Sequence, residues 1–339
     1  MINRRIGLSV NLLKSSNDVD GHAQIRPIFY VYKGGPLPRH LTHIRVDKSI
    51  KEIPDELFSE SQVQVVELHE ELFKIGKLAF YNCRCLERIS RATGVRIIEE
   101  GAFYRCKRMS DIELGMKLER IGLSAFARCS SIRGLNIPSV KIVEGYAFQY
   151  CVNITSVNFG EGLERLNEFT FLNCYALEHI AVPLKGNLIG NDVFTGCTAL
   201  ANVEFVGGVH RKISHLSLQT WKEEMNDCID EIKRLLASVP TGGKTAAVQR
   251  WIRNVATQFE IYTNEHDRTL NDAATLLELS AWGFNLKDEE VDSCDDESSL
   301  RDKSRKRRKV DILALRQERR MTSGANVVIK NVLPFLQLK

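Results

Sequence analysis

The sequence predicts an α/β repeat fold, a right-handed solenoid of parallel strands followed by an α-helical hairpin. Two observations predict it. Phenylalanine recurs every 22 or 23 residues at seven positions, which are Phe58, Phe80, Phe103, Phe126, Phe148, Phe171 and Phe194. After the last of these, the apolar residues change to the three-and-four spacing of amphipathic helices. A fixed period of this length is typical of proteins built from stacked, similar turns.

The turns share one apolar pattern. An Ile, Leu or Val stands five residues before each phenylalanine, and a cysteine three residues after it in turns two to seven. Three further inward positions follow each cysteine, although the second turn puts Arg91 at the third of them. A period of 23 with an L-x-x-I-x-I segment is typical of leucine-rich-repeat geometry. The extended part should pair with neighbouring turns at about 4.8 Å, while the short A-F-x-x-C part allows one helical turn.

The repeat resembles a known family. The segments IGKLAFYNCRCLERI and IGLSAFARCSSIRGL follow the pattern I-G-x-x-A-F-x-x-C-x-x-L-x-x-I of the BspA-like leucine-rich repeat family. Further segments, such as the lead-in PRHLTHIRVDKSIKEIP and the closing SGANVVIKNVLPFL, resemble one multidomain subset that is abundant in single-celled algae. The resemblance covers most of the chain apart from residues 286–311, and it implies the architecture more firmly than a role.

The composition is that of an ordinary folded protein. The 339 residues are 43% hydrophobic and 27% charged, close to globular averages. A net charge of +4 argues against a dedicated nucleic-acid domain. No stretch reaches the roughly 18 apolar residues that a membrane span needs, so we expect no membrane partner. The N-terminus lacks a secretory cleavage pattern, and the nine cysteines do not form a disulfide framework. We therefore expect an intracellular protein, in the cytoplasm, the nucleus or both.

Five segments are predicted along the chain. They are an N-terminal lead-in or cap (1–40), a solenoid of seven turns (41–214), a helical hairpin cap (215–284), an acidic then basic flexible linker (285–311), and a C-terminal helix with an apolar tail (312–339). We expect the hairpin to cover the last turn, because the ends of repeat arrays need caps. A coiled coil that forms a homodimer is the alternative.

Two motifs resemble known binding sites. They are the cysteine column, which could suggest a zinc site, and the GGKT turn, which could suggest a nucleotide site. Stacked cysteines project their sulfurs along a line, whereas zinc needs four converging ligands, so we predict buried structural thiols and no metal. The string SVPTGGKT resembles a phosphate-binding loop, but Ser238 stands where the first glycine should be and a helix precedes it. We interpret it as the turn of the hairpin, with a nucleotide-binding switch as the alternative function.

The outward side chains of the strands form a polar face of mixed charge. No catalytic cluster, cofactor motif or small-molecule site is recognisable in it, and we predict a non-enzymatic protein-protein interaction scaffold for an unknown intracellular partner. The candidate protein-binding face consists of Arg88, Asp111, Glu113, Asn136, Asn158, His179 and Glu204. A basic ridge suited to an acidic partner is predicted along the helical edge of turns two to four, at Arg84, Arg105, Lys107, Arg108 and Arg128. A solvated surface is the alternative for this ridge.

A short basic run follows the acidic part of the linker. It consists of Lys303, Arg305, Lys306, Arg307, Arg308 and Lys309. Runs of this kind are read by nuclear-import receptors, so a nuclear adaptor is a further alternative. A solvated patch, neutralised by the acidic block beside it, explains the same residues without any targeting.

Overall fold

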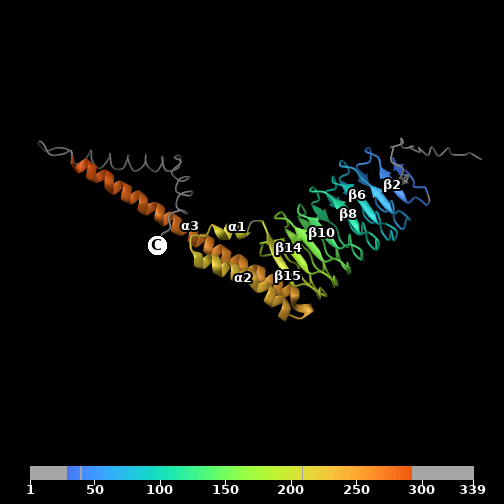
Figure 1. The fold of residues 1–339 in the computed structure, drawn as a ribbon. Helices are drawn as coiled ribbons and strands as arrows, with labels where there is room; N and C mark the ends of the chain where they lie inside the picture. The colour runs from blue at the N-terminus through green and yellow to red at the C-terminus, as the bar shows by residue number, and fades with distance from the viewer. Residues whose placement is uncertain (1–28, 39, 208, 292–339) are drawn as a thin grey trace, which may run out of the picture. The chain divides into compact units, whose positions relative to one another are not determined.

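The protein is described by a computed structural model over residues 29–38, 40–207 and 209–291. Fifteen strands in this part of the chain form three parallel sheets, and helices follow them. Figure 1 shows β2, β6, β8, β10, β14 and β15 in chain order along the solenoid. The predicted fold class, a parallel-strand solenoid of about seven turns followed by a helical region, is confirmed.

The longer strands form two sheets, which carry the outward face of the solenoid. The five-stranded sheet contains β1 (Tyr30–Tyr32), β2 (His43–Val46), β4 (Val65–Glu67), β6 (Arg88–Ala92) and β8 (Asp111–Leu114). The four-stranded sheet contains β10 (Gly134–Ile137), β12 (Ser156–Phe159), β14 (His179–Pro183) and β15 (Asn202–Val206). All pairings are parallel, and from β2 onward they join residues one turn apart, which is the register expected from the repeat period. The first strand, β1, pairs with β2 only 14 residues further along the chain.

Short strands of two residues each form the third sheet. They are β3 (Glu52–Ile53), β5 (Lys74–Ile75), β7 (Ile97–Ile98), β9 (Arg120–Ile121), β11 (Ile142–Val143) and β13 (Arg165–Leu166). A parallel bridge between Leu166 and Ile189 extends this ladder into the last turn. The second residue of each strand is buried, which places the apolar column before each phenylalanine inside.

The seven phenylalanines form one continuous stack in the core, and each of them is fully buried. Neighbouring rings are nearly parallel, with centroids 5.1 Å apart for Phe103 and Phe126 and 6.1 Å apart for Phe171 and Phe194. Offset stacking at such distances stabilises aromatic pairs beyond the effect of burial alone. The predicted inward columns are therefore confirmed for these side chains.

The second turn departs from the predicted pattern through a β-bulge. The pairing of β6 with β8 shifts register between Ile89 and Ala92. Arg91 bulges outward with φ of 57°, and its N–H donates to Glu113 Oε2 at 2.8 Å. Ala92 is fully buried and takes the third inward position, opposite Leu114. The prediction that Arg91 occupies that position is wrong, because one extra residue in a strand changes which side chains face inward.

The helical region contains α1 (Val209–Ser214), α2 (Gln219–Ser238) and α3 (Lys244–Val291), with the 3₁₀ turn η1 (Thr241–Gly243) between α2 and α3. The chain divides into two compact units. One contains the solenoid and Asp227–Ala256, and the other contains His210–Asn226 and the described residues from Thr257 onward. Within the second unit, the rings of Trp221 and Tyr262 stack with centroids 5.3 Å apart.

The predicted segment boundaries stay predictions, but two observations bear on them. The helix α3 continues to Val291, past the predicted end of the hairpin at residue 284. The remaining linker residues and the segment 312–339 lie outside the described residues, as does the basic run. In the part of the chain that is described, no helix is both long enough and apolar enough to span a membrane.

Candidate functional site

The predicted binding face falls into two groups, because its residues lie on two sheets. Arg88, Asp111 and Glu113 lie on the five-stranded sheet, where Arg88 Nε and Asp111 Oδ2 form an ion pair at 2.8 Å. The second group lies on the four-stranded sheet and consists of Asn136, Asn158, His179 and Glu204. The structure thus separates a charged part of the face from a largely uncharged polar part.

The second group is aligned by the strand register. Asn136 pairs with Asn158 on the neighbouring strand. The His179 ring lies 3.9 Å from the Glu204 carboxylate, so it carries an ion pair only when protonated. Ala181, two residues after His179 on β14, is only 6% exposed. It lies in register between Asn158 and Glu204, and its short side chain leaves little surface between these larger neighbours.

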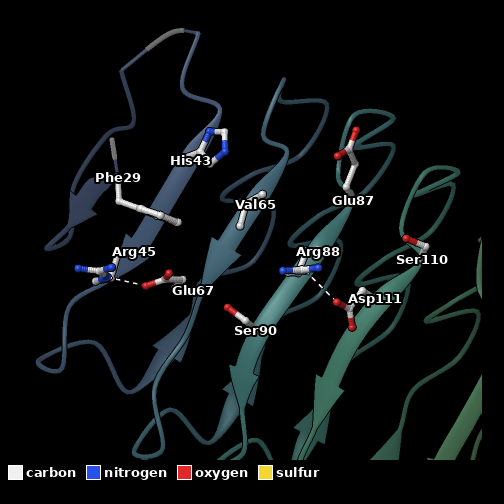
Figure 2. Close-up of a pocket in the computed structure, with 10 residues that line it drawn as sticks. All are labelled: Phe29, His43, Arg45, Val65, Glu67, Glu87, Arg88, Ser90, Ser110 and Asp111. Carbon is white, nitrogen blue, oxygen red and sulfur yellow. Dashed lines mark hydrogen bonds and ion pairs between the residues drawn. The ribbon is translucent and has the colours of Figure 1, made fainter. Parts of the chain in front are cut away.

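A hollow of about 580 Å³ lies on the charged part of the face. Figure 2 shows Arg45 directed toward Glu67 and Arg88 directed toward Asp111 across neighbouring strands. The full lining is Phe29, His43, Arg45, Val65, Glu67, Glu87, Arg88, Ser90, Ser110 and Asp111. The volume lies within the roughly 300–1,000 Å³ that ligand sites occupy, and eight of the ten lining residues are polar or charged.

Phe29 supplies the aromatic surface of the hollow. Its ring lies edge-on to the His43 ring, with centroids 5.5 Å apart. The Arg45 guanidinium lies over the same ring, 5.1 Å from the centroid, and donates from Nε to Glu67 at 2.6 Å. Because a guanidinium can stack on a ring and bind a carboxylate at the same time, Arg45 links the aromatic surface of the hollow to its charged rim.

Sequence reasoning missed the N-terminal half of this hollow. This half lies around the first phenylalanine turn, where the 23-residue period is not yet established. Its residues are Phe29, His43, Arg45 and Glu67. The available signal was local. In β2 the outward residues His43 and Arg45 alternate with buried Ile44 and Val46, which is the two-residue period of a half-buried strand.

The cysteine column serves the core. Each of its thiols is buried and donates to the carbonyl of the phenylalanine in the preceding turn, as Cys106 Sγ does to Phe80 O at 3.1 Å. Desolvation raises the pKa of Cys83, Cys151 and Cys197 from about 9 to about 12. Within the described ranges, no group of three or more His, Cys, Asp or Glu side chains could hold a metal ion. The column supplies weak hydrogen-bond donors that fit inside the stack.

The GGKT turn lies at the open end of the solenoid. In each inner turn, the N–H of the phenylalanine donates to a carbonyl of the next turn, as Phe171 N does to Val193 O at 3.0 Å. The N–H of Phe194, in the last turn, donates to Thr245 Oγ1 at 2.9 Å. A side-chain oxygen thus replaces the backbone carbonyl of an eighth turn.

Two more side chains of α3 complete this closure. Lys244 is 5% exposed, and its Nζ donates to Thr198 O and Leu200 O, both at 2.8 Å. Gln249 Nε2 donates to Ile189 O at 3.0 Å, where inner turns receive a backbone N–H. Burial lowers the pKa of Lys244. In a phosphate-binding loop, the corresponding ammonium would contact the nucleotide. Here the Lys244 ammonium instead donates to two carbonyls of the last turn.

Apolar packing accompanies these hydrogen bonds. The Trp251 indole is buried and stacks on Phe205, with ring centroids 4.5 Å apart. Its Nε1 donates to Cys228 O at 2.7 Å, which joins α3 to α2. The neighbouring α3 residues Val248 and Val255 are fully buried. Trp251 of α3 therefore covers the apolar end of the last turn, and it is itself bonded to α2.

One family model matches the repeat region of the chain. The model of the BspA type leucine rich repeat region matches in six copies, over residues 38–151 and 124–220. No curated protein matches the chain.

Solved structures of bacterial repeat proteins are also similar to the chain. A leucine-rich repeat protein of T. pallidum is 26% identical with a TM-score of 0.43, and the match covers 52% of this chain and 83% of that one. A leucine-rich repeat protein of Bacteroides ovatus is 18% identical with a TM-score of 0.25, covering 46% and 59%. The pneumococcal vaccine antigen PcpA is 14% identical with a TM-score of 0.26, covering 50% and 57%. Because the family model matches more than half of the residues, this chain belongs to the BspA-type leucine-rich repeat family.

Proposed function

We propose that the protein is a non-enzymatic interaction scaffold whose strand face binds a segment of a partner protein, with the hollow at Phe29 and Val65 as the anchor point. Leucine-rich-repeat solenoids are generally associated with protein-protein interaction. The observation that carries the proposal is the hollow itself, which combines aromatic and aliphatic surface with two ion pairs on adjacent parallel strands.

The chemistry of the hollow suits a protein segment. The Phe29 ring and the Val65 side chain offer surface for an apolar anchor residue, and aromatic or arginine anchors dominate the binding energy of many interfaces. The two ion pairs are partly solvent-exposed, with Arg88 and Asp111 side chains 58% and 46% exposed. Exposed pairs contribute little to folding, so a partner can replace them with its own hydrogen bonds at small cost.

The decisive experiment separates the strand face from the rest of the surface. The full chain captures proteins from its native cells, and the recovered partner is then produced pure for affinity measurements. We expect Arg88→Ala to weaken binding about tenfold, because it removes a guanidinium that lines the hollow and can bond to the partner segment. Arg165→Ala on β13 removes an exposed arginine from the other sheet and should leave the affinity unchanged.

Crosslinking provides the independent check. A bound partner should crosslink to strands β2, β4, β6 or β8. Equal affinity of both variants, together with crosslinks confined to other surfaces, would remove the strand face from consideration.

A further inference from the structure

The edge of the solenoid that carries the phenylalanine turns presents a second surface. Its members are Tyr81, Tyr104, Arg105, Arg128 and Tyr150, which we call the arginine–tyrosine ridge. We propose that this ridge is a docking surface for an acidic, Asp- and Glu-rich segment of a partner protein. The proposal goes beyond the strand face and does not rest on it, because the two surfaces share no residue.

Contacts with tyrosine rings order both guanidinium groups of the ridge. Tyr81 and Tyr104 stack with centroids 5.4 Å apart and planes 7° apart. The Arg105 guanidinium lies over the Tyr104 ring at 5.4 Å, and the Arg128 guanidinium lies over the Tyr150 ring at 4.7 Å. A side chain that is already ordered loses less conformational entropy when it binds a ligand. The ridge is therefore organised before any partner arrives.

The two arginines also lack carboxylate partners. Elsewhere on the solenoid, cations pair with acids of an adjacent turn, as Lys77 does with Glu100 at 2.8 Å and Arg120 with Glu144 at 3.0 Å. Among the residues that the structure describes, no carboxylate lies within 4.0 Å of the Arg105 or Arg128 guanidinium. Their charge remains available to an external anion.

The arginines of the ridge, together with Lys107 and Arg84, make this edge basic. Lys107 is exposed, and it forms no ion pair within the described residues. Arg84 Nε donates to a neighbouring amide oxygen instead of a carboxylate. Arg108 is the exception among the predicted ridge residues, because it pairs with Glu87 at 2.7 Å. Among the described residues, four of the five predicted cations thus form no ion pair, and of these Arg84 and Lys107 are exposed while Arg105 and Arg128 are half-buried.

The two arginines occupy one repeated backbone position of the solenoid. Arg105 and Arg128 adopt left-handed φ values of 62° and 63°, a conformation that favours Gly and Asn. The equivalent position is left-handed in every turn, and the other turns carry Glu60, Asn82, Tyr150, Asn173 and Gly196 there. The left-handed corner is thus a feature of the repeat, and it places Arg105, Arg128 and Tyr150 at the same position of three successive turns.

A carboxylate-rich protein segment fits this chemistry better than a nucleic acid does. A guanidinium binds a carboxylate through charge-assisted, often paired hydrogen bonds. Single-stranded nucleic acid would instead stack its bases on free aromatic faces. The Tyr104 ring already contacts the Tyr81 ring and the Arg105 guanidinium, and the Tyr150 ring contacts Arg128.

The test uses the full chain and a fluorescent peptide of about ten alternating Asp and Glu residues, with anisotropy as the readout. We expect saturable binding by the wild type that weakens markedly when salt is raised from about 50 to 300 mM, because screening shortens the reach of the charges. The variant Arg105→Asn with Arg128→Asn should lose about tenfold in affinity for each arginine. Its melting temperature should not fall, because asparagine suits the left-handed backbone.

Arg165→Asn, at an exposed position of β13, is the matched control for removing a charge, and its affinity should equal that of the wild type. Several results would overturn the proposal. They are an absence of saturable binding at about 1 mM peptide, salt-independent binding, or unchanged affinity in the double variant. Tighter binding of a single-stranded DNA of equal length would assign the ridge to nucleic acid instead. None of these results bears on the strand face, which the peptide experiment does not probe.

Discussion

An inner turn of the solenoid and its last turn bury the same columns but close their backbone hydrogen bonds differently. For Phe171 in an inner turn, the acceptor is a backbone carbonyl of the following turn. For Phe194 the acceptor is the Thr245 hydroxyl, and Lys244 Nζ serves the last-turn carbonyls. Inner turns are thus closed by a backbone pattern that any suitable sequence supplies, while the last turn depends on particular side chains.

This difference separates two kinds of sensitivity to mutation. In a repeat array each turn contacts only its neighbours, so an inner turn is stabilised from both sides. The last turn has one repeat neighbour and the side chains of α3. We therefore expect core substitutions to be costly in the stack and polar substitutions to be costly only at the closing turn.

The largest expected effect is a cavity in the middle of the stack. Phe126→Ala removes a fully buried ring between Phe103 and Phe148, and should lower the free energy of unfolding by about 3–5 kcal/mol. Asn136→Ala, at an exposed strand position of β10, should change it by less than about 0.5 kcal/mol. Urea unfolding of both variants provides the measurement. Equal stabilities would contradict the assignment of inward and outward positions.

A medium effect is expected at the closing turn. Lys244→Met keeps the aliphatic stem but leaves Thr198 O and Leu200 O without their donor. Unsatisfied buried polar groups cost about 1–3 kcal/mol each, partly offset because a buried ammonium no longer has to be desolvated. Lys117→Met, at an exposed position, is the matched control and should change stability by less than about 0.5 kcal/mol.

Lys244→Met also tests the nucleotide-binding alternative. If GGKT closes the solenoid, hydrogen exchange of the Phe194 amide should become faster in this variant, because the whole closing turn loosens. If GGKT binds phosphate instead, a labelled nucleotide should bind the wild type and be lost in the variant, without a change in stability.

The periodic part of the fold was predictable, whereas the closing turn was only partly so. Each phenylalanine and cysteine recurs at one phase, and stacking of equivalent positions follows directly from that period. The bulge at Arg91 was not predictable, because one inserted residue leaves the period of the neighbouring turns unchanged. The string GGKT was correctly placed in the hairpin turn, but which carbonyls Lys244 meets depends on tertiary packing.

The binding face was predictable in part for the same reason. Alternation within a strand indicates which side chains point outward, so Arg88 and Asp111 could be named from the sequence. Whether outward residues form a hollow depends on the chain before the repeats, and Phe29 comes from there. A sequence period predicts only the features that the turns share. The hollow depends on Phe29, which lies before the repeats and has no counterpart in them.

The smallest effect concerns single thiols of the inner turns. Burial raises the pKa of Cys151 to about 12 from about 9 in the unfolded chain. The stabilisation from holding this proton is therefore complete below about pH 9 and is lost as the pH rises toward 12. Each such thiol should cost up to about 1.4 kcal/mol per pH unit in that range.

Cys151→Ala isolates this contribution. The variant should be less stable than the wild type at pH 8, because it loses a packed sulfur and its hydrogen bond to Phe126 O. The stability difference should shrink by about 1 kcal/mol at pH 10, since only the wild type has to keep this thiol protonated. Urea unfolding under reducing conditions measures it, with Asn136→Ala as a variant that removes no titratable group. A difference that stays constant between the two pH values would mean that Cys151 ionises alike in the folded and unfolded chain, and that its place in the stack does not shield it from water.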